Sequence, residues 1–480
     1  MSPGISFGTD GWRGLMSSDF TDRNVRCVAD ALYRSLRKHT PSIAIGFDGR
    51  KDSDRFAAAC AEVLAGRGAT VLLSPSVIPT PVLSFAVRHF HCDAGIMITA
   101  SHNPPEYNGI KFKASYGGPY MTEQTKEVES LLLAEPPAVA RASAPESIRK
   151  VDFLPSYFAH LREIVDVKIL ASFANGAGRK PGIIIDSMGG AGQMLLEEFL
   201  EPLGWRAQTI FGEAEPTFFG RTPEPVERNL GPLLYNTGVT ESLVGIATDG
   251  DADRCSVVYA DGTWMNAQET ILALLYHLHT YRHQHGAIVK TASVTDKVRL
   301  MAERWNEPLH EVHVGFKYIA EVMLAHDCMF GGEESGGFGY GMHIPERDGI
   351  LSGLLFAEML AKSERSLIDI VEEIRREFGT LHYARIDAFY TSPDRSEILP
   401  RLAATVPTSV GGLSVLGVKN YKELGNLTGL KYLCGDSRWL LIRTSQTEPI
   451  IRFYAEGQSD AEVTALLNEG KLLTGLGEEK

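Results

Sequence analysis

The sequence predicts an α/β protein of several domains, followed by a smaller C-terminal module of α+β type. At 480 residues the chain is too long for one ordinary core, and its length suggests roughly three or four domains. Short apolar runs alternate with helical patterns over most of the chain, as in βαβ units. After residue 379 this alternation gives way to strands with few helices between them.

The first domain is predicted over residues 1–150. Its strands are expected at 42–47, 70–73 and 94–98, and the Ala-rich stretch 54–66 has a helical pattern. Residues 133–150 are rich in Ala, Pro and Ser, which is typical of a loose connection between domains.

The same alternation then begins again twice. The second domain, residues 151–260, has predicted strands at 182–186, 243–247 and 255–259, with a helix from about Gln193. The third domain, residues 261–378, has predicted strands at 287–291, 310–313 and 328–331, and helices at 295–304, 317–325, 348–362 and 366–378. Gly379 follows the last helix in the position of a C-terminal cap.

The remaining residues, 379–480, are predicted to form the α+β domain. Strands are expected at 384–391, 438–443 and 449–456, with a helix at the C-terminal end. The fold class is therefore three topologically similar mixed α/β domains plus a C-terminal α+β domain.

Composition excludes several classes of protein. The chain is 44% hydrophobic and 22% charged, as in ordinary soluble proteins, and its formal net charge of −13 argues against a nucleic-acid or anionic-membrane surface. The six cysteines are scattered without a CxxC pair, so we expect reduced thiols. The N-terminus lacks an apolar signal region, and no apolar run approaches the ~18 residues of a spanning helix. We expect a cytoplasmic protein.

The stretch TASHNPP, residues 99–105, follows the predicted strand 94–98. The carboxyl end of a strand in an open α/β sheet is where ligands bind. Ser101, with the imidazole of His102 beside it, is therefore a candidate nucleophile. A simple turn is the alternative, because Ser, Asn and Pro are ordinary loop residues.

The stretch DGDADR carries three carboxylates, Asp249, Asp251 and Asp253, between two predicted strands. Alternating carboxylates in a tight loop can converge on one hard cation, and Mg²⁺ takes such oxygen ligands. The alternative is a solvated acidic turn. An EF-hand is excluded because its Gly and Glu positions hold Arg254 and Ala260. A phosphatase with Asp249 as nucleophile is disfavoured, because Asp253 stands where a Thr or Val is expected.

Two further loops have the composition of ligand sites. GGEESGG, residues 331–337, offers carboxylates and a hydroxyl to sugar hydroxyls, although a glycine hinge is the alternative. RTSQTEP, residues 443–449, has the donors of a phosphate cradle, although a polar hairpin loop would look similar. Lys317, at a strand-to-helix junction, could contact a phosphate or move a proton, but a lone lysine is more often solvated.

Two other patterns are interpreted as structural. The glycine loop at 186–192 resembles a dinucleotide loop, but Leu195 occupies the position of the third glycine. The histidine pairs lack a plausible third metal ligand and are expected to be surface or partly packed residues; they are His89/His91, His277/His279 and His283/His285.

Together these motifs resemble the α-D-phosphohexomutase family, which includes phosphoglucomutase and phosphomannomutase. FGTDGWRG at 7–14, TASHNPPEYNGIKF at 99–112, DGDADR, GGEESGG and RTSQTEP occur in the family's order along the whole chain. The resemblance implies four domains around a central cleft and a Mg²⁺-dependent transfer through a phosphoserine enzyme. The substrate would be a phosphorylated hexose, with glucose 1,6-bisphosphate as intermediate and activator.

The resemblance also implies a role for each matched residue. Ser101 would carry the phosphate and, with Asp249, Asp251 and Asp253, would hold Mg²⁺. Glu333 and Ser335 would grip sugar hydroxyls. The non-reacting phosphate would be held by Arg443, Ser445, Gln446 and Thr447. The reacting end would be lined by Arg13, His102, Lys111, Arg254 and Lys317, with His102 or Lys317 as the base.

Glu334 stands where the family's glucose enzymes usually carry Glu, which favours interconversion of glucose 1-phosphate and glucose 6-phosphate. Gly337 replaces a His common in mannose-active members, and Gln446 replaces the Gly or Asn common in the phosphate loop. Three alternatives are a phosphomannomutase or dual-specificity enzyme, an aspartyl-phosphate phosphatase, and a non-catalytic sugar-phosphate binding protein. The oligomeric state is not predicted.

Overall fold

A computed structural model describes residues 5–8, 10–135, 147–176, 180–390, 395–445 and 449–476. The chain forms two compact units. Unit 1 comprises Met1–Ala287 and Gly315–Ile370, and unit 2 comprises Ile288–Val314 and Val371–Lys480. Most of the predicted connection 133–150, namely 136–146, lies outside the described residues. The domain boundaries at 150, 260 and 378 stay predictions.

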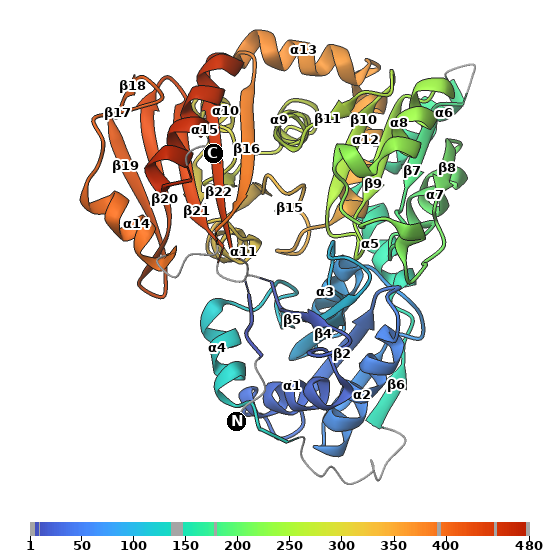
Figure 1. Ribbon diagram of the computed structural model, residues 1–480. Coiled ribbons are helices and arrows are strands. Elements are labelled where there is room, and N and C mark those ends of the chain that lie inside the picture. The colour runs from blue at the N-terminus through green and yellow to red at the C-terminus, as the bar shows by residue number, and fades with distance from the viewer. Residues whose placement is uncertain are drawn as a thin grey trace. The chain divides into compact units, whose positions relative to one another are not determined.

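The N-terminal part of unit 1 is built on a six-stranded mixed sheet, ordered β1-β5-β4-β2-β3-β6 (Figure 1). Strands β2, β3, β4 and β6 are parallel, whereas β5 runs antiparallel to both β4 and β1. Their bounds are β1 Trp12–Leu15, β2 Ser42–Phe47, β3 Thr70–Leu73, β4 Ala94–Ile98, β5 Tyr107–Ala114 and β6 Ile148–Lys150.

Helices cover both faces of this sheet. They are α1 Asp22–Ser35, α2 Ser53–Gly66, α3 Thr80–His89 and α4 Thr122–Ser130. The core on one face joins Val28 of α1 and Leu64 of α2 to Ile45 and Ile96 of the strands. Gly95 is next to Ile96 and so faces the other side. A Cβ built on Gly95 would lie 2.5 Å from Val87 Cγ2 of α3, so glycine lets that helix pack closely.

The second sheet of unit 1 has the order β11-β10-β9-β7-β8. Strands β7, β8 and β9 are parallel, and β10 is antiparallel to β9 and β11. The strand bounds are β7 Gly182–Asp186, β8 Arg206–Ile210, β9 Val244–Thr248, β10 Cys255–Tyr259 and β11 Trp264–Met265. The helices are α5 Leu154–Ile164, α6 Val167–Gly176, α7 Leu195–Leu200 and α8 Gly231–Val239, with short 3₁₀ turns at Glu201–Leu203, Phe218–Gly220 and Glu227–Asn229.

The segment from Ala267 to Phe378 contributes to both units. In unit 1 it forms α9 Ala267–Tyr276, the π-helical turn His277–Tyr281, α11 Phe316–Ala325, α12 Gly349–Ser363 and the antiparallel pair β14 Cys328–Gly332 and β15 Phe338–Tyr340. In unit 2 it forms the parallel pair β12 Ala287–Thr291 and β13 Leu309–Val312, with α10 Lys297–Trp305 between them. Helix α13 spans Leu367–Phe378, and Gly379 follows it at φ +87°, as the C-cap prediction required.

Unit 2 is completed by an antiparallel sheet, β16-β22-β21-β20-β19, and a small pair, β17 and β18. The bounds are β16 His382–Phe389, β17 Ser409–Val410, β18 Leu413–Ser414, β19 Gly417–Glu423, β20 Asn426–Gly435, β21 Arg438–Thr444, β22 Ile450–Gly457, α14 Arg395–Ala404 and α15 Asp460–Thr474. The buried Lys431 joins this sheet to the β12–β13 region. Its ammonium donates to Ala292 O at 2.9 Å and lies 4.1 Å from the Trp439 ring centre.

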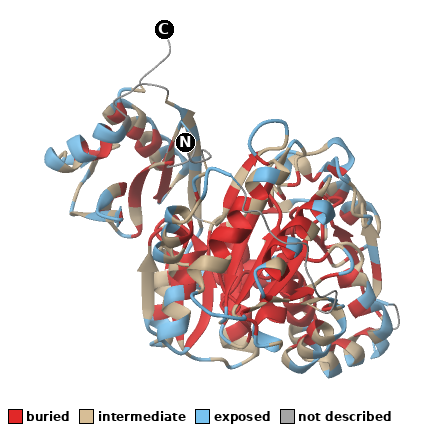
Figure 2. Ribbon diagram, turned by 90° about the horizontal axis from the view of Figure 1, so that it is seen from below, coloured by how far each residue is buried: buried red, intermediate tan, exposed pale blue. Residues whose placement is uncertain are grey.

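In both units the buried residues concentrate in the strands and the inner sides of the helices (Figure 2). The mixed α/β class with a C-terminal α+β part is confirmed. The sequence prediction missed several strands, including β1, β5 and β8, and also β19 and β20 of the C-terminal sheet. Within the described residues, no helix combines the length and apolarity needed to cross a membrane.

Candidate active site

Three loops of unit 1 share one architecture and meet at their tips. Each leaves the carboxyl end of a strand and returns in an antiparallel strand: the serine loop 99–106 joins β4 to β5, the acidic loop 249–254 joins β9 to β10, and the glycine loop 333–337 joins β14 to β15. Cys255 N donates to Gly336 O at 2.9 Å, which ties the acidic loop to the glycine loop. The structure therefore brings together loops that are far apart in sequence.

Ser101 lies at the centre of this arrangement and is 1% exposed. Its hydroxyl donates to Asp249 Oδ2 at 2.8 Å, and His102 Nδ1 lies 3.3 Å from Ser101 Oγ. The backbone of Ser101 adopts φ +52°, a left-handed conformation that non-glycine residues seldom take. Such outliers concentrate at functional sites, where the surroundings hold them.

The three aspartates of the acidic loop are fully buried, and one carboxylate oxygen of each lies within 4.8 Å of the others. Lys111 Nζ donates to Asp251 Oδ2 and to Asp253 Oδ2, both at 2.7 Å. Among the described residues, Asp251 Oδ1 and Asp253 Oδ1 have no hydrogen-bond partner. Buried carboxylate oxygens without a donor are unfavourable, and an oxygen-only donor set suits a hard divalent cation. The residues present therefore fit a Mg²⁺ site.

The buried aspartates and Lys111 shift one another's pKa values. Burial raises the pKa of Asp249, and repulsion from Asp251 and Asp253 adds to it. Burial would also raise the pKa of Asp251, but Lys111, Thr80 and Arg347 together outweigh burial and lower that pKa. Conversely, burial acts to lower the pKa of Lys111, and its acidic neighbours raise it. Lys111 is thus held charged between carboxylates.

Several cations surround Ser101. Arg254 Nε lies 3.8 Å from Asp249 Oδ2, and Arg13 Nη1 donates to Asn103 Oδ1 of the serine loop at 2.5 Å. Burial lowers the pKa of His102, with Arg254 and Arg13 as the next causes, so its imidazole is neutral near pH 7. A neutral imidazole can accept a proton, and the arginines can offset charge on a phosphate.

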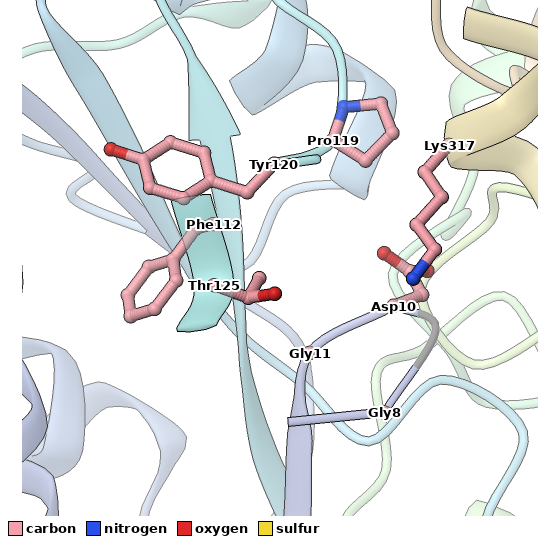
Figure 3. A pocket seen from close by; sticks show the side chains of 8 residues that line it. All are labelled: Gly8, Asp10, Gly11, Phe112, Pro119, Tyr120, Thr125 and Lys317. Atoms are coloured by element: carbon pink, nitrogen blue, oxygen red, sulfur yellow. The ribbon is translucent and has the colours of Figure 1, made fainter. Parts of the chain in front are cut away.

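The glycine loop presents Glu333 and Ser335. Burial raises the pKa of Glu333 to about 7, with repulsion from Glu334 adding to it and Arg347 opposing it. Ser335 is half-buried at the tip of the same turn. Lys317, at the start of α11, is 4% exposed and lines a small pocket with Asp10 and Gly11. Figure 3 shows its side chain extending toward Asp10.

The fourth predicted loop belongs to unit 2. Arg443 lies near the end of β21 and is 7% exposed, and Ser445 N donates to Ile450 O at 2.9 Å. Gln446 and Thr447 lie outside the described residues. Their expected contact with a phosphate stays a prediction.

Comparison with known families decides the identity of this arrangement. Models of four phosphoglucomutase/phosphomannomutase domains match in order: alpha/beta/alpha domain I over residues 4–137, domain II over 155–262, domain III over 267–378 and the C-terminal domain over 413–470. The chain belongs to the phosphoglucomutase/phosphomannomutase family. It is therefore an enzyme of the phosphohexomutase class, and the family resemblance expected from the motifs is confirmed.

Individual phosphohexomutases are similar over nearly the whole chain. A phosphoglucomutase/phosphomannomutase of Thermococcus kodakarensis is 28% identical over 98% of both chains. A phosphoglucomutase of Komagataeibacter xylinus is 28% identical over 97% of this chain and 90% of its own. The crystal structure of a candidate phosphomannomutase from Thermus thermophilus is 36% identical, covers 99% of this chain and 100% of its own, and has a TM-score of 0.84.

Two residues of this phosphohexomutase site were missed by sequence reasoning. Arg347, 4% exposed, lies 2.8 Å from Asp253 Oδ2 and also pairs with Asp10. Asp10 lies 3.0 Å from Lys111 Nζ. Asp10 stands inside the motif FGTDGWRG, and this motif is the signal in the sequence that points to it as a site residue. Arg347 stands in an ordinary polar segment before α12, and nothing local signals that its partners are residues 10 and 253.

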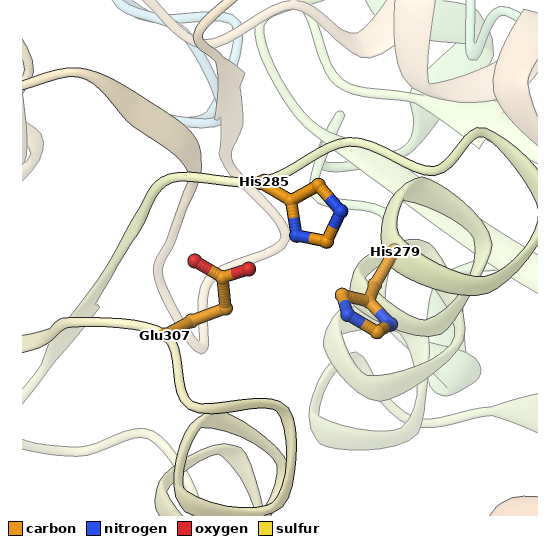
Figure 4. A group of neighbouring side chains, drawn as sticks. All are labelled: His279, His285 and Glu307. Atoms are coloured by element: carbon orange, nitrogen blue, oxygen red, sulfur yellow. The ribbon is translucent and has the colours of Figure 1, made fainter.

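The two patterns interpreted as structural differ in their outcome. The 186–192 loop backs the acidic loop of the phosphohexomutase site, because Ala191 N donates to Gly250 O at 2.9 Å. The prediction that the histidine pairs lack a third metal ligand is wrong for His279 and His285, because one ligand atom of each and one of Glu307 all lie within 4.8 Å of one another (Figure 4). His277 differs from the surface position expected of it, because it is fully buried, 3.2 Å from Glu358 Oε1.

Proposed function

We propose that this phosphohexomutase interconverts glucose 1-phosphate and glucose 6-phosphate through a phosphorylated Ser101. The observation that carries the proposal is the placement of the Ser101 hydroxyl 2.8 Å from Asp249, inside a buried cluster of three aspartates, Lys111 and flanking arginines. Such a cluster suits phosphoryl transfer, which depends on positioning and charge neutralisation.

We propose that Asp249, Asp251, Asp253 and the Ser101 phosphate hold Mg²⁺. Support comes from Asp251 Oδ1 and Asp253 Oδ1, which accept no hydrogen bond within the part of the chain that the structure describes. An Aspergillus fumigatus N-acetylphosphoglucosamine mutase of similar fold, 14% identical with a TM-score of 0.57, is described in complex with GlcNAc-6P and magnesium. Bound at these carboxylates, the cation would offset negative charge on the transferred group.

In the first half-reaction the bond between Ser101 Oγ and phosphorus breaks as the sugar 6-hydroxyl oxygen binds that phosphorus. The hydroxyl proton passes to His102 or Lys317, and Arg13, Arg254 and Lys111 offset the charge. The product is glucose 1,6-bisphosphate. This bisphosphate reorients in the site. Ser101 Oγ then binds the phosphorus of the 1-phosphate as the bond from that phosphorus to the sugar 1-oxygen breaks, the base returns its proton to the 1-oxygen, and glucose 6-phosphate leaves. Glu333 and Ser335 hold sugar hydroxyls, and Arg443, Ser445, Gln446 and Thr447 hold the non-reacting phosphate.

Glucose is the proposed substrate because Glu334 matches the residue usual in glucose enzymes of the family, and because the Komagataeibacter relative is named a phosphoglucomutase. Mannose phosphate is the second candidate, supported by the name of the Thermus structure. A relative from Sulfurisphaera tokodaii, 28% identical over 98% of both chains, is named a phosphoglucosamine/phosphogalactosamine mutase. We propose a cytoplasmic enzyme that binds neither nucleic acid nor membrane.

The test is an assay with Mg²⁺, glucose 1,6-bisphosphate and each of the glucose, mannose and glucosamine 1-phosphates. The proposal expects the highest kcat/KM with glucose 1-phosphate and loss of turnover in Ser101→Ala. Full turnover in Ser101→Ala would contradict the phosphoserine route. Steady release of inorganic phosphate that is lost in Asp249→Asn, but kept in Ser101→Ala, would favour the phosphatase alternative. Binding of the sugar phosphates without interconversion would favour the binding-protein alternative.

A further inference from the structure

The left-handed conformation of Ser101 requires something to hold it. Its φ of +52° is disfavoured for a residue with a Cβ by about 1–2 kcal/mol, and serine lacks the enrichment of Asn or Asp in this region. Any relaxation toward an ordinary φ would swing the side chain and displace Oγ from Asp249. The structure supplies restraints on both backbone polar groups of Ser101.

The carbonyl side is held by Arg50. Its Nη2 donates to Ser101 O at 2.6 Å and to Asn103 O at 2.7 Å, and its Nη1 donates to Pro104 O and Tyr107 O at 2.8 and 3.0 Å. The remaining Nε–H donates to Asp48 Oδ2 at 3.1 Å. All five N–H groups of one guanidinium are thus engaged, and only arginine offers five donors in a planar fork.

The amide side is held by Thr99, whose hydroxyl oxygen accepts from Ser101 N at 2.8 Å. Thr99 follows β4, and Asp48 follows the parallel strand β2. The last residues of these two strands, Ile98 and Phe47, are paired. Asp48 N donates to Ile98 O at 3.0 Å, which places Asp48 beside Thr99 at one sheet edge. A hydrogen bond from Thr99 is among the interactions that act on the Asp48 carboxyl.

The residues that make these contacts are buried and have further hydrogen bonds among themselves. Asp48, Arg50 and Thr99 are 1–3% exposed, and the Arg50 guanidinium lies 4.7 Å from the centre of the buried Phe218 ring. Ser53 Oγ and the amide of Arg50 also donate to Asp48 Oδ1, at 2.9 and 3.1 Å. Charged hydrogen bonds in a water-excluded position are strong and directional.

We propose that Asp48, Arg50 and Thr99 form a Ser101 clamp, a set of positioning residues that fixes the backbone of Ser101 for phosphoryl transfer. This inference rests on the proposed function of Ser101 and extends it to residues that do not touch the substrate. Displacing a reacting group by about 1 Å can cost about 10²-fold in rate. Loosening the clamp therefore slows transfer while leaving the sugar and phosphate contacts intact.

The decisive variant is Arg50→Lys, which keeps the charge but offers three donors in place of five. We expect kcat to fall by about 10–100-fold and KM to change by less than about 3-fold. Arg282→Lys is the matched control, because Arg282 pairs with the buried Glu358 and donates to Ile164 O, away from the three loops. The control should lose comparable stability in urea unfolding and keep kcat.

Thr99→Val and Thr99→Ser form a second pair that does not disturb Arg50. Valine removes the acceptor for the Ser101 amide and should lower kcat, whereas serine keeps the hydroxyl and should restore it. If Arg50→Lys or Thr99→Val loses stability but keeps kcat within about 2-fold, the clamp is only structural and the inference is wrong.

Hydrogen–deuterium exchange separates the clamp from the proposed function. In Arg50→Lys, amides of residues 101–107 should exchange faster than in the wild type, and those of α3 should not. Faster exchange in this segment, together with a wild type that shows no mutase activity, would overturn the proposed function and leave the clamp intact. Unchanged exchange with wild-type kcat would overturn the clamp alone.

Discussion

Gly250 and Ser101 are pressed together, because a Cβ built on Gly250 would lie 2.3 Å from the carbonyl oxygen of Ser101. The glycine of DGDADR therefore lets the acidic loop approach the serine loop closely enough for Asp249 to accept from the Ser101 hydroxyl. The contact joins two loops about 150 residues apart, at the point where the proposed chemistry occurs.

Gly250→Ala should consequently separate the serine and aspartate loops. We expect kcat to fall by about 10²-fold, because the methyl group must displace the Ser101 backbone. Gly176→Ala is the control, because nothing lies within 4 Å of a Cβ built on Gly176. Steady-state kinetics of both variants check this, and an unchanged kcat in Gly250→Ala would show that the contact is dispensable.

Lys111→Met should destabilise the protein, because it leaves Asp251 and Asp253 buried without their shared ammonium. Removing one partner of a buried charge pair costs about 3–5 kcal/mol. Urea unfolding measures the loss. A divalent cation should restore more stability to Lys111→Met than to the wild type, since it supplies the missing positive charge. Equal stability of the two proteins would contradict this picture of the cluster.

Mg²⁺ should raise the unfolding temperature of the wild type, and a chelator should reverse the effect. In Asp251→Asn the shift should be largely lost, because one ligand charge is gone. Asp30→Asn is a suitable comparison: Asp30 is a buried aspartate paired with Arg34 on α1 and with Arg67, which directly follows α2. The Asp30→Asn variant should have a lower unfolding temperature than the wild type, and Mg²⁺ should raise that temperature by the same amount as in the wild type. Equal responses in the two variants would argue against the acidic loop as the metal site.

Glu333 should make stability depend on pH near neutrality. Its pKa is raised from 4.5 to about 7 in the folded protein, chiefly by burial. Because the folded protein binds this proton more tightly than the unfolded chain, the contribution of Glu333 to the free energy of unfolding is greatest below pH 4.5. It is lost as the pH rises through 7. Between pH 5 and pH 8.5 the wild type should lose on the order of 2 kcal/mol relative to Glu333→Gln. Parallel unfolding profiles for the two proteins would rule out a buried, titrating Glu333.

Asp348→Ala should destabilise unit 1 by more than a lost helix cap alone. Asp348 accepts from Leu351 N at 2.8 Å at the start of α12, and also from Tyr157 OH at 2.7 Å, with His343 Nε2 at 3.0 Å. Losing the cap costs about 1 kcal/mol, and the orphaned buried groups add about 1–3 kcal/mol each. Chemical denaturation tests this, with Asp348→Asn expected to fall between the wild type and the alanine variant.

Sequence reasoning located the three loops because each follows a short apolar strand, such as 94–98 or 243–247, and polar or glycine residues mark the break. It missed β5, because Lys111 and Lys113 look like solvent-facing residues in a strand, yet both are buried against carboxylates supplied by residues 251, 253 and 346. It also missed Arg50, since four of its five hydrogen bonds go to carbonyls of residues 101–107. Long-range pairing of this kind leaves no local pattern.

The central claim is that Ser101 stores the phosphate that is transferred. The most direct measurement is to load the protein with glucose 1,6-bisphosphate and Mg²⁺, remove the free sugar, and locate the phosphate by mass spectrometry of peptides. A chase with glucose 1-phosphate follows. The account predicts one phosphate on Ser101, discharged by the chase as glucose 1,6-bisphosphate and glucose 6-phosphate form. A phosphate on Asp249, or none on Ser101 in a protein that still interconverts the two sugar phosphates, would contradict it.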